Sequence, residues 1–146
     1  MTIPARLRAR VILDTNVFLS GIFFGGVPGR LLDAWQAGHL ALVLSPAILA
    51  EYHRAGAELA VRYPQAAALL HPLLAIVAQS ATMVNAPELP EPVSADPDDD
   101  KFLACAVASR AHVIVSGDKH LLRVSGWNSI EVLTPRQMAD RYKLDR

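Results

Sequence analysis

Four acidic residues, far apart in the chain, stand at the predicted ends of strands or near the starts of helices. Asp14 ends one apolar, β-branched run, and Asp118 closely follows another. Ligands bind at the carboxyl ends of strands in open α/β sheets, so these two acids predict a site there. Glu51 and Asp99 lie in segments with helical patterning. Grouped carboxylates repel one another, and we therefore expect all four to surround a metal ion.

The residue types favour a hard divalent cation. Mg²⁺ takes oxygen ligands and is commonly held by one or two carboxylates, several waters and a substrate phosphate. The sequence contains no cluster of Cys and His residues of the kind that binds zinc.

Asp99 is the acid that faces the sheet in a helical projection. At about 100° per residue, Asp99 projects into the middle of an apolar face, while Asp98 and Asp100 lie to either side. That face consists of Phe102, Leu103, Ala106 and Val107. The alternative is that Asp99 is a solvated carboxylate favoured by the helix dipole, and Asp100 could be merely exposed.

Each of the other acids also has an alternative, purely structural interpretation. Glu51 lies one turn after Ala47 and Ile48, on or beside a packed face, and could simply pair with Arg54, three residues later. Asp14 could cap a following helix, and Asp118 could belong to an ordinary turn. All of these interpretations would have to hold together for the predicted site to be absent.

Short β-branched runs alternate with longer helical ones, which predicts βαβ units and a parallel sheet. A Gly-rich bend at 25–29 precedes a helix through Trp35, and Ser45 with Pro46 begins the helix that carries Glu51. Asp96 with Pro97 begins another helix. The expected strands are 10–13, 40–44, 82–84, 113–116 and 130–133, and further helices are expected at 65–78 and from the capping box at Thr134 to Tyr142.

Composition indicates one intracellular domain. The 146 residues are 52% hydrophobic, enough for one core, and the formal net charge of zero gives no general sign of nucleic-acid binding. The single Cys105 is expected to be a core thiol in a reducing cytosol. No apolar stretch approaches the roughly 18 residues of a membrane span, and no secretory cleavage pattern occurs, so we expect a soluble cytoplasmic protein without membrane contact.

Four motifs, in this order along the chain, resemble those of the PIN-domain family. The motifs are residues 11–17 (VILDTNV), 44–46 (LSP) leading to Glu51, 96–103 (DPDDDKFL) and 115–118 (VSGD). The chain is similar in particular to single-domain bacterial and archaeal members thought to be VapC-like toxins of toxin-antitoxin pairs. The resemblance runs from about Arg10 to Leu133.

The resemblance implies a three-layer α/β/α, Rossmann-like fold with a mainly parallel central sheet, formed by a single PIN domain over residues 1–146. It also implies a ribonuclease that depends on Mg²⁺ or Mn²⁺. Its catalytic acids would be Asp14, Glu51, Asp99 and Asp118, of which Asp14, Asp99 and Asp118 would bind the metal. Thr15, Asn16 and Ser116 would support them.

Two positions complicate this assignment. The triple Asp98–Asp100 leaves the helix acid uncertain by one position, although the projection favours Asp99. Many relatives carry a further acid where this chain has His120, which puts a second tightly held metal in doubt.

The partners implied by the resemblance are an RNA substrate and a cognate antitoxin, and a homodimer is plausible. Candidate RNA contacts are Arg30, Lys101, Lys119 and Arg123, although solvated surface charge is the better explanation for any one of them. Phe23, Phe24 and Trp35 could line a partner groove, although core packing is the better explanation for these aromatics. Two other functions stay open: a non-catalytic PIN scaffold that binds RNA or protein, and a metal phosphoesterase acting on DNA or a small phosphodiester.

Overall fold

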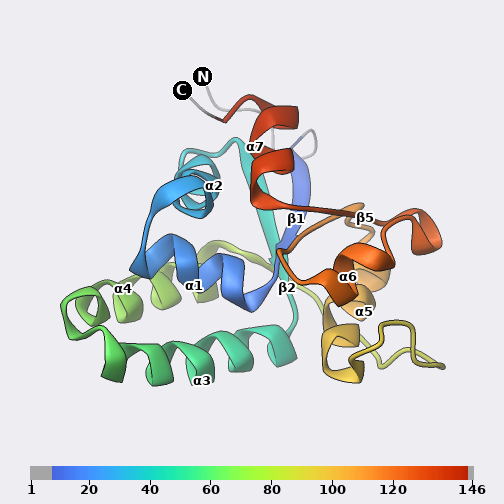
Figure 1. The fold of residues 1–146 in the computed structure, drawn as a ribbon, viewed down its shortest axis with the longest axis horizontal. Coiled ribbons are helices and arrows are strands. Elements are labelled where there is room, and N and C mark those ends of the chain that lie inside the picture. The colour runs from blue at the N-terminus through green and yellow to red at the C-terminus, as the bar shows by residue number, and fades with distance from the viewer. Residues whose placement is uncertain (1–7, 145–146) are drawn as a thin grey trace.

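A computed structural model describes residues 8–144, which are built around a five-stranded sheet (Figure 1). The strands are β1 (Ala9–Leu13), β2 (Leu40–Leu44), β3 (Thr82–Met83), β4 (Val113–Val115) and β5 (Glu131–Leu133). Their order is β3-β2-β1-β4-β5, and all four pairings are parallel. The expected α/β fold with a parallel sheet is confirmed.

The strand order places a topological switch point between β1 and β4. The chain steps from β1 through β2 to β3 in one direction, then crosses back over the sheet to β4 on the other side of β1. A crevice for ligands opens at the carboxyl ends of the strands at such a point. Leu13 pairs with Val115, so Asp14 and Ser116 leave the sheet side by side.

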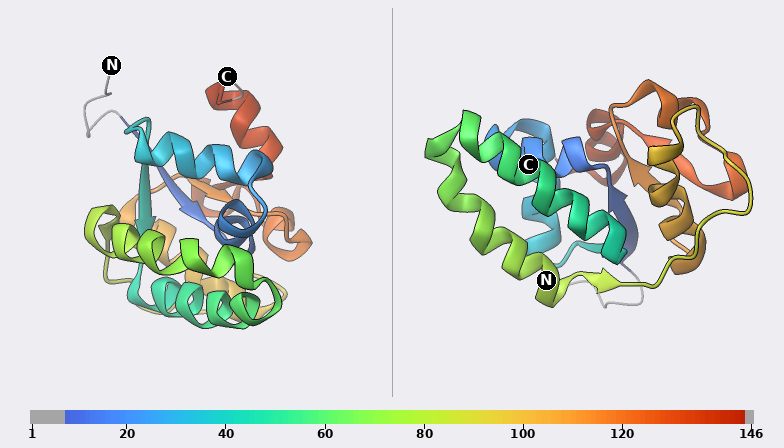
Figure 2. Two further views of the ribbon diagram at one scale, coloured as in Figure 1. Left: turned by 90° about the vertical axis from the view of Figure 1, so that its left-hand side faces the viewer. Right: turned by 90° about the horizontal axis from the view of Figure 1, so that it is seen from below.

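Helices cover both faces of the sheet and complete three layers. The helices are α1 (Thr15–Phe23), α2 (Gly26–Gln36), α3 (Pro46–Arg62), α4 (Pro64–Ser80), α5 (Asp100–Ser109), α6 (Lys119–Arg123) and α7 (Pro135–Tyr142), with 3-10 turns η2 (Pro97–Asp99) and η3 (Trp127–Ser129). Helix α5 packs across β1, β2 and β4, whereas α2 contacts β2 and α7 contacts β5. The antiparallel pair α3 and α4 lies beside α1 and extends away from the sheet (Figure 2).

Local sequence signals set several of these boundaries. The Ser45 hydroxyl accepts a hydrogen bond from the Ile48 amide at 3.3 Å, and Pro46 occupies the first position of α3. Thr134 and Gln137 form the expected capping box at the start of α7. These signals place Glu51 and the C-terminal helix as predicted.

Helix α1 was not among the elements expected from the strand-to-bend pattern. The chain enters α1 directly after Asp14, and the Gly-rich segment forms the corner before α2. Gly25 and Gly26 adopt φ values of 71° and 62°, the left-handed region that glycine tolerates best. The short helix α6 also went unpredicted, because five residues are too few for a helical period to be recognised.

The core lies on both faces of the central strands. Ile12, Leu44 and Ile114 from the sheet are fully buried, as are Phe102 and Leu103 of α5. Cys105 is a buried free thiol in this core, as expected, and burial raises its pKa to about 12.

No single helix within residues 8–144 has the length and apolar composition needed to cross a membrane. Taken together, α1 and α2 meet that test by length and composition only, with a bend of 94° between them.

Candidate active site

Asp14 lies at the carboxyl end of β1 and is 6% exposed. Its backbone amide donates to the Val115 carbonyl at 2.9 Å, which continues the β1–β4 ladder. The Ser116 hydroxyl donates to Asp14 Oδ2 at 2.5 Å. Burial raises the pKa of Asp14, and the charges of Asp118 and Glu51 act in the same direction, against hydrogen bonds from Ser116 and the Asn16 amide. Asp14 is therefore rigidly held in acidic surroundings.

Ser116 connects Asp14 to Asp118. Its hydroxyl oxygen accepts a hydrogen bond from the Asp118 amide at 2.9 Å while it donates to Asp14. Asp118 caps α6, and its Oδ1 accepts from the His120 amide at 2.6 Å. The structural alternative for Asp118, a role in a local turn, therefore accounts for only one of its carboxylate oxygens, Oδ1. The same residue lies close enough to contribute to the raised pKa values of Asp14 and Asp99.

Asp99 belongs to the same site, because it lies close enough to Asp118 and Asp14 for their charges to affect its pKa. It ends η2, a turn that Asp96 caps by accepting from the Asp98 amide at 3.0 Å. The Asp99 Oδ2 atom is buried and has no hydrogen-bond partner among the described residues. Burial raises the pKa of Asp99 to about 7, with further contributions from the charges of Asp118, Asp96, Asp14 and Asp98.

Asp100 has a different task from Asp99. Its carboxylate accepts hydrogen bonds from the backbone amides of Val93 at 3.0 Å and Ser94 at 2.8 Å. It therefore anchors the Pro-rich connection between β3 and η2, residues 84–96. The alternative that Asp100 is merely exposed is wrong. The helical projection agrees with the position of Asp99, but it was wrong for Val107, which is 43% exposed.

Glu51 lies near this group but is already paired. The Thr15 hydroxyl donates to Glu51 Oε2, and Lys101 Nζ donates to Oε1. The expected alternative partner, Arg54, lies farther away, with 3.7 Å between Nη2 and Oε1. Glu51 therefore differs from Asp99, whose buried Oδ2 has no partner within residues 8–144.

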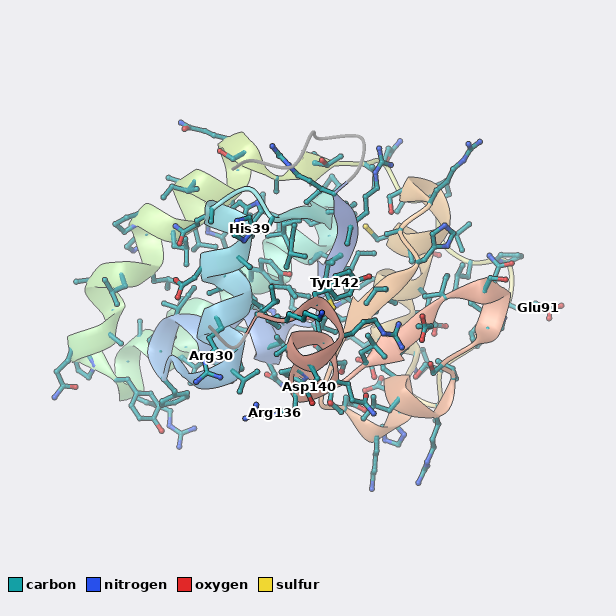
Figure 3. The ribbon with its side chains drawn as sticks, turned by 90° about the horizontal axis from the view of Figure 1, so that it is seen from above. Arg30, His39, Glu91, Arg136, Asp140 and Tyr142 are labelled. Atoms are coloured by element: carbon teal, nitrogen blue, oxygen red, sulfur yellow. The ribbon has the colours of Figure 1, made fainter. Side chains whose placement is uncertain are left out.

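The four basic residues predicted to contact RNA lie in different surroundings. Lys101 bonds to Glu51 and to Asp98, so it is an internal ion-pair partner and not a free surface cation. Lys119 and Arg123 are exposed on α6, the helix that Asp118 caps. Arg30 is exposed on α2, on the side where α7 carries Arg136 and Asp140 (Figure 3).

The three aromatic residues that could line a partner groove differ in how far they are exposed. Trp35 is 8% exposed and belongs to the core, and Phe23 packs against the core while partly exposed. Phe24 is 59% exposed and makes an edge contact with Tyr63, with ring centroids 5.0 Å apart.

Tyr52 is a supporting residue that the sequence interpretation missed. Its hydroxyl donates to the Leu13 carbonyl at 2.5 Å, and its ring stacks on Phe18 with centroids 4.1 Å apart. Burial raises the pKa of Tyr52 well above its ordinary value. The hydroxyl thereby fixes the end of β1 just before Asp14. The position of Tyr52 directly after Glu51 was the sequence signal that could have identified it.

The donor set fits a divalent cation that is held loosely. Among residues 8–144, no three or more His, Cys, Asp and Glu side chains are arranged as a ready metal cage. Yet Asp14 and Asp118 both raise the pKa of Asp99, and Asp99 Oδ2 is buried without a partner. Mg²⁺ needs only one or two protein carboxylates, with waters filling the other positions. These oxygens could therefore hold such an ion.

The part of the chain that carries these residues resembles known proteins. The chain is similar to the "Uncharacterized protein MJ1680" of Methanocaldococcus jannaschii, with 28% identity over 149 aligned positions that cover 94% of each chain. The sequence pattern of the PIN domain matches residues 10–120, from β1 to the first turn of α6. That segment contains Asp14, Glu51, Asp99 and Asp118. The chain belongs to the PIN domain family.

Proposed function

We propose that this protein is a divalent-metal-dependent endoribonuclease. PIN domains are generally nucleases that hydrolyse phosphodiester bonds. The observation that carries the proposal is the buried Asp99 Oδ2 atom, which no described residue hydrogen-bonds and which lies close enough to Asp118 and Asp14 for their charges to add to the rise in its pKa that burial causes. Active sites are places where burial and like charges shift pKa values in this way.

Some side chains of the site would bind the metal ion, and others hold those ligands in position. Asp14, Asp99 and Asp118 supply oxygen ligands, and Ser116 holds Asp14 and Asp118 in fixed relation. A bound Mg²⁺ or Mn²⁺ would supply Lewis-acid chemistry at the scissile phosphate and lower the pKa of the attacking water. Exposed Lys119 and Arg123, near Asp118 in the chain, are placed to attract the RNA backbone.

The biological part of the proposal is a toxin that a cognate antitoxin neutralises. It is supported by the resemblance of the four motifs to VapC-like toxins. The same proposal includes a cytoplasmic location, where such an RNA target would be met, and residues 1–146 acting as a single domain. A homodimer belongs to the same proposal, and light scattering that finds only monomer at all concentrations would exclude it.

The test compares RNA cleavage by the wild-type protein and by Asp14→Asn. A matched control is Asp33→Asn, which removes an exposed acid from α2. We expect cleavage of single-stranded RNA with Mg²⁺ or Mn²⁺, loss of cleavage in EDTA, and a decrease of about 100-fold or more in Asp14→Asn, since removal of one key charge-stabilising group commonly has that effect. Asp33→Asn should retain wild-type activity, and induced expression in cells should be toxic only for the active forms.

The outcomes separate the competing functions. RNA binding that needs no metal and survives both Asp14→Asn and Asp118→Asn would indicate a non-catalytic scaffold. Turnover of DNA or a small phosphodiester, but not of RNA, would indicate a phosphoesterase of another specificity. Absence of RNA cleavage under all metal conditions, with no effect of Asp14→Asn on toxicity, would refute the ribonuclease.

A further inference from the structure

Lys101 brings a fixed positive charge to the edge of the acidic site. It lies in the first turn of α5, two residues after Asp99. Its Nζ donates to Glu51 Oε1 and to Asp98 Oδ1, the latter at 3.1 Å. The side chains of Lys101 and Glu51 are only 19% and 12% exposed, so this pair is shielded from water far more than an ordinary surface ion pair.

Both carboxylate oxygens of Glu51 are engaged by this arrangement. Lys101 takes Oε1, and Thr15, the residue after Asp14, donates its hydroxyl to Oε2. Because the Lys101 ammonium already balances its charge, Glu51 offers a metal ion less electrostatic attraction than an unpaired carboxylate would. Asp99, in contrast, has a buried oxygen that no described residue hydrogen-bonds.

The ammonium group compensates the charge of two carboxylates at the edge of the site. Nucleases with two metal ions use a pair of cations, about 4 Å apart, to stabilise the attacking and leaving oxygens. Here Glu51 and Asp98 are already joined by one ammonium, which links α3 to the segment that carries Asp99. That ammonium would repel a second divalent ion bound by Glu51.

We propose that Lys101 is a positioning residue that takes the place of a second metal ion. It holds Glu51 in a fixed ion pair, so the site binds one divalent cation through Asp14, Asp99 and Asp118, with Glu51 outside the inner coordination shell. This inference rests on the proposed metal-dependent function and specifies how its site is built.

The test is a titration of the full-length protein with Mn²⁺, followed by calorimetry and by the electron paramagnetic resonance of free Mn²⁺. The variants are Glu51→Gln, Lys101→Met, Lys101→Arg and Lys101→Met/Glu51→Gln, with Asp14→Asn as the ligand control. Circular dichroism and thermal unfolding establish that each variant folds.

We expect one Mn²⁺ per wild-type chain and about tenfold or greater weakening in Asp14→Asn, against less than about threefold in Glu51→Gln. Lys101→Met releases Glu51 and should either add a second ion or tighten binding by about tenfold. Lys101→Arg keeps the charge and should restore one ion at wild-type affinity. Lys101→Met/Glu51→Gln should remove the gain, because the released carboxylate is gone.

Two results would overturn the inference. One is a Glu51→Gln variant that loses Mn²⁺ as strongly as Asp14→Asn, which would make Glu51 a direct ligand. The other is a folded Lys101→Met variant with unchanged stoichiometry and affinity. If the variants bind Mn²⁺ as expected but the protein cleaves no RNA, only the proposed ribonuclease function is refuted. A wild-type protein that binds no Mn²⁺ would refute both the ribonuclease function and the role of Lys101.

Discussion

At the scale of single residues, three aspartates that share a neighbourhood are held in different ways. Asp14 and Asp118 are fixed through Ser116, whereas Asp99 has a buried oxygen that accepts no hydrogen bond from the part of the chain that the structure describes. Burial and the neighbouring charges make the ionised form of Asp99 costly. A bound cation would favour the ionised form of Asp99 and offset that cost.

The first prediction concerns the stability of Asp99→Asn as a function of pH. The pKa of Asp99 is raised from 3.8 to about 7 in the folded protein, so ionisation of this group lowers stability as pH rises through that window. In EDTA, the free energy of unfolding of Asp99→Asn relative to wild type should increase between pH 4 and pH 7 and level off above. After allowance for partial exposure, the total gain should be on the order of 1 kcal/mol.

Urea denaturation of both proteins at pH 4, 5, 6, 7 and 8 measures this difference. Asp33→Asn should show no such trend, because Asp33 is exposed on α2. A difference that stays constant across the range would show that Asp99 does not titrate in the way its surroundings indicate.

At the scale of elements, the site depends on close contacts that hold loops and helices around the ends of the strands. Asp100 fastens the connection before η2 through two backbone amides, and Tyr52 fastens the end of β1. Helices α1 and α2 meet closely at Gly21, where an added Cβ would lie 2.6 Å from Leu32 Cδ1 and 3.0 Å from the Pro28 carbonyl oxygen.

The second prediction is that Asp100→Ala loosens the Pro-rich connection. Two buried or partly buried amides lose their acceptor, so the free energy of unfolding should fall by about 1–3 kcal/mol. Hydrogen exchange should show faster exchange of the amides at Val93 and Ser94, while those of β1 keep their protection relative to global stability. Unchanged exchange at these two amides would contradict the anchoring role.

The third prediction compares two glycines at the α1–α2 contact. Gly21→Ala should destabilise the protein by about 1–3 kcal/mol, because the new methyl group meets a backbone carbonyl that cannot move alone. Gly29→Ala is the control, since its Cβ would make an ordinary contact at 3.5 Å, and it should be neutral or stabilising. Equal effects of the two substitutions in thermal unfolding would refute the packing argument.

The elements that could be predicted from the sequence are those with strong local signals. Ser45 with Pro46 and the capping box at Thr134 mark helix starts by short-range hydrogen bonding, which the sequence encodes directly. The pairing of Lys101 with Glu51 could not be predicted in this way, because it joins residues 50 positions apart and depends on how α3 meets α5. Asp100 was undervalued for the same reason, since its partners are backbone amides of an irregular segment.

At the scale of the whole molecule, the strand order brings the acids together. The switch between β1 and β4 brings Asp14 and Asp118 to the ends of adjacent strands, just beyond β1 and β4. The crossover from β3 to β4 carries Asp99 in η2, directly before α5. A metal ion bound there would connect segments from both halves of the sheet. Binding should therefore stabilise the entire fold.

The fourth prediction is that Mn²⁺ raises the thermal stability of the wild-type protein. A ligand at about 100 times its Kd adds roughly 2.7 kcal/mol to the free energy of unfolding when it binds only the folded state. Asp118→Asn should lose most of this gain, whereas Asp33→Asn should keep it. Calorimetric scans with and without Mn²⁺, at matched ionic strength, measure the effect, and equal gains in all three proteins would point to nonspecific binding.

The central claim, that the three aspartates hold a divalent cation, is tested most directly by anomalous diffraction from crystals grown with Mn²⁺. We predict one anomalous peak among the carboxylates of Asp14, Asp99 and Asp118, with Glu51 still paired to Lys101. If saturating Mn²⁺ gives no peak at this position, or only a peak elsewhere on the chain, the three aspartates do not form the metal site.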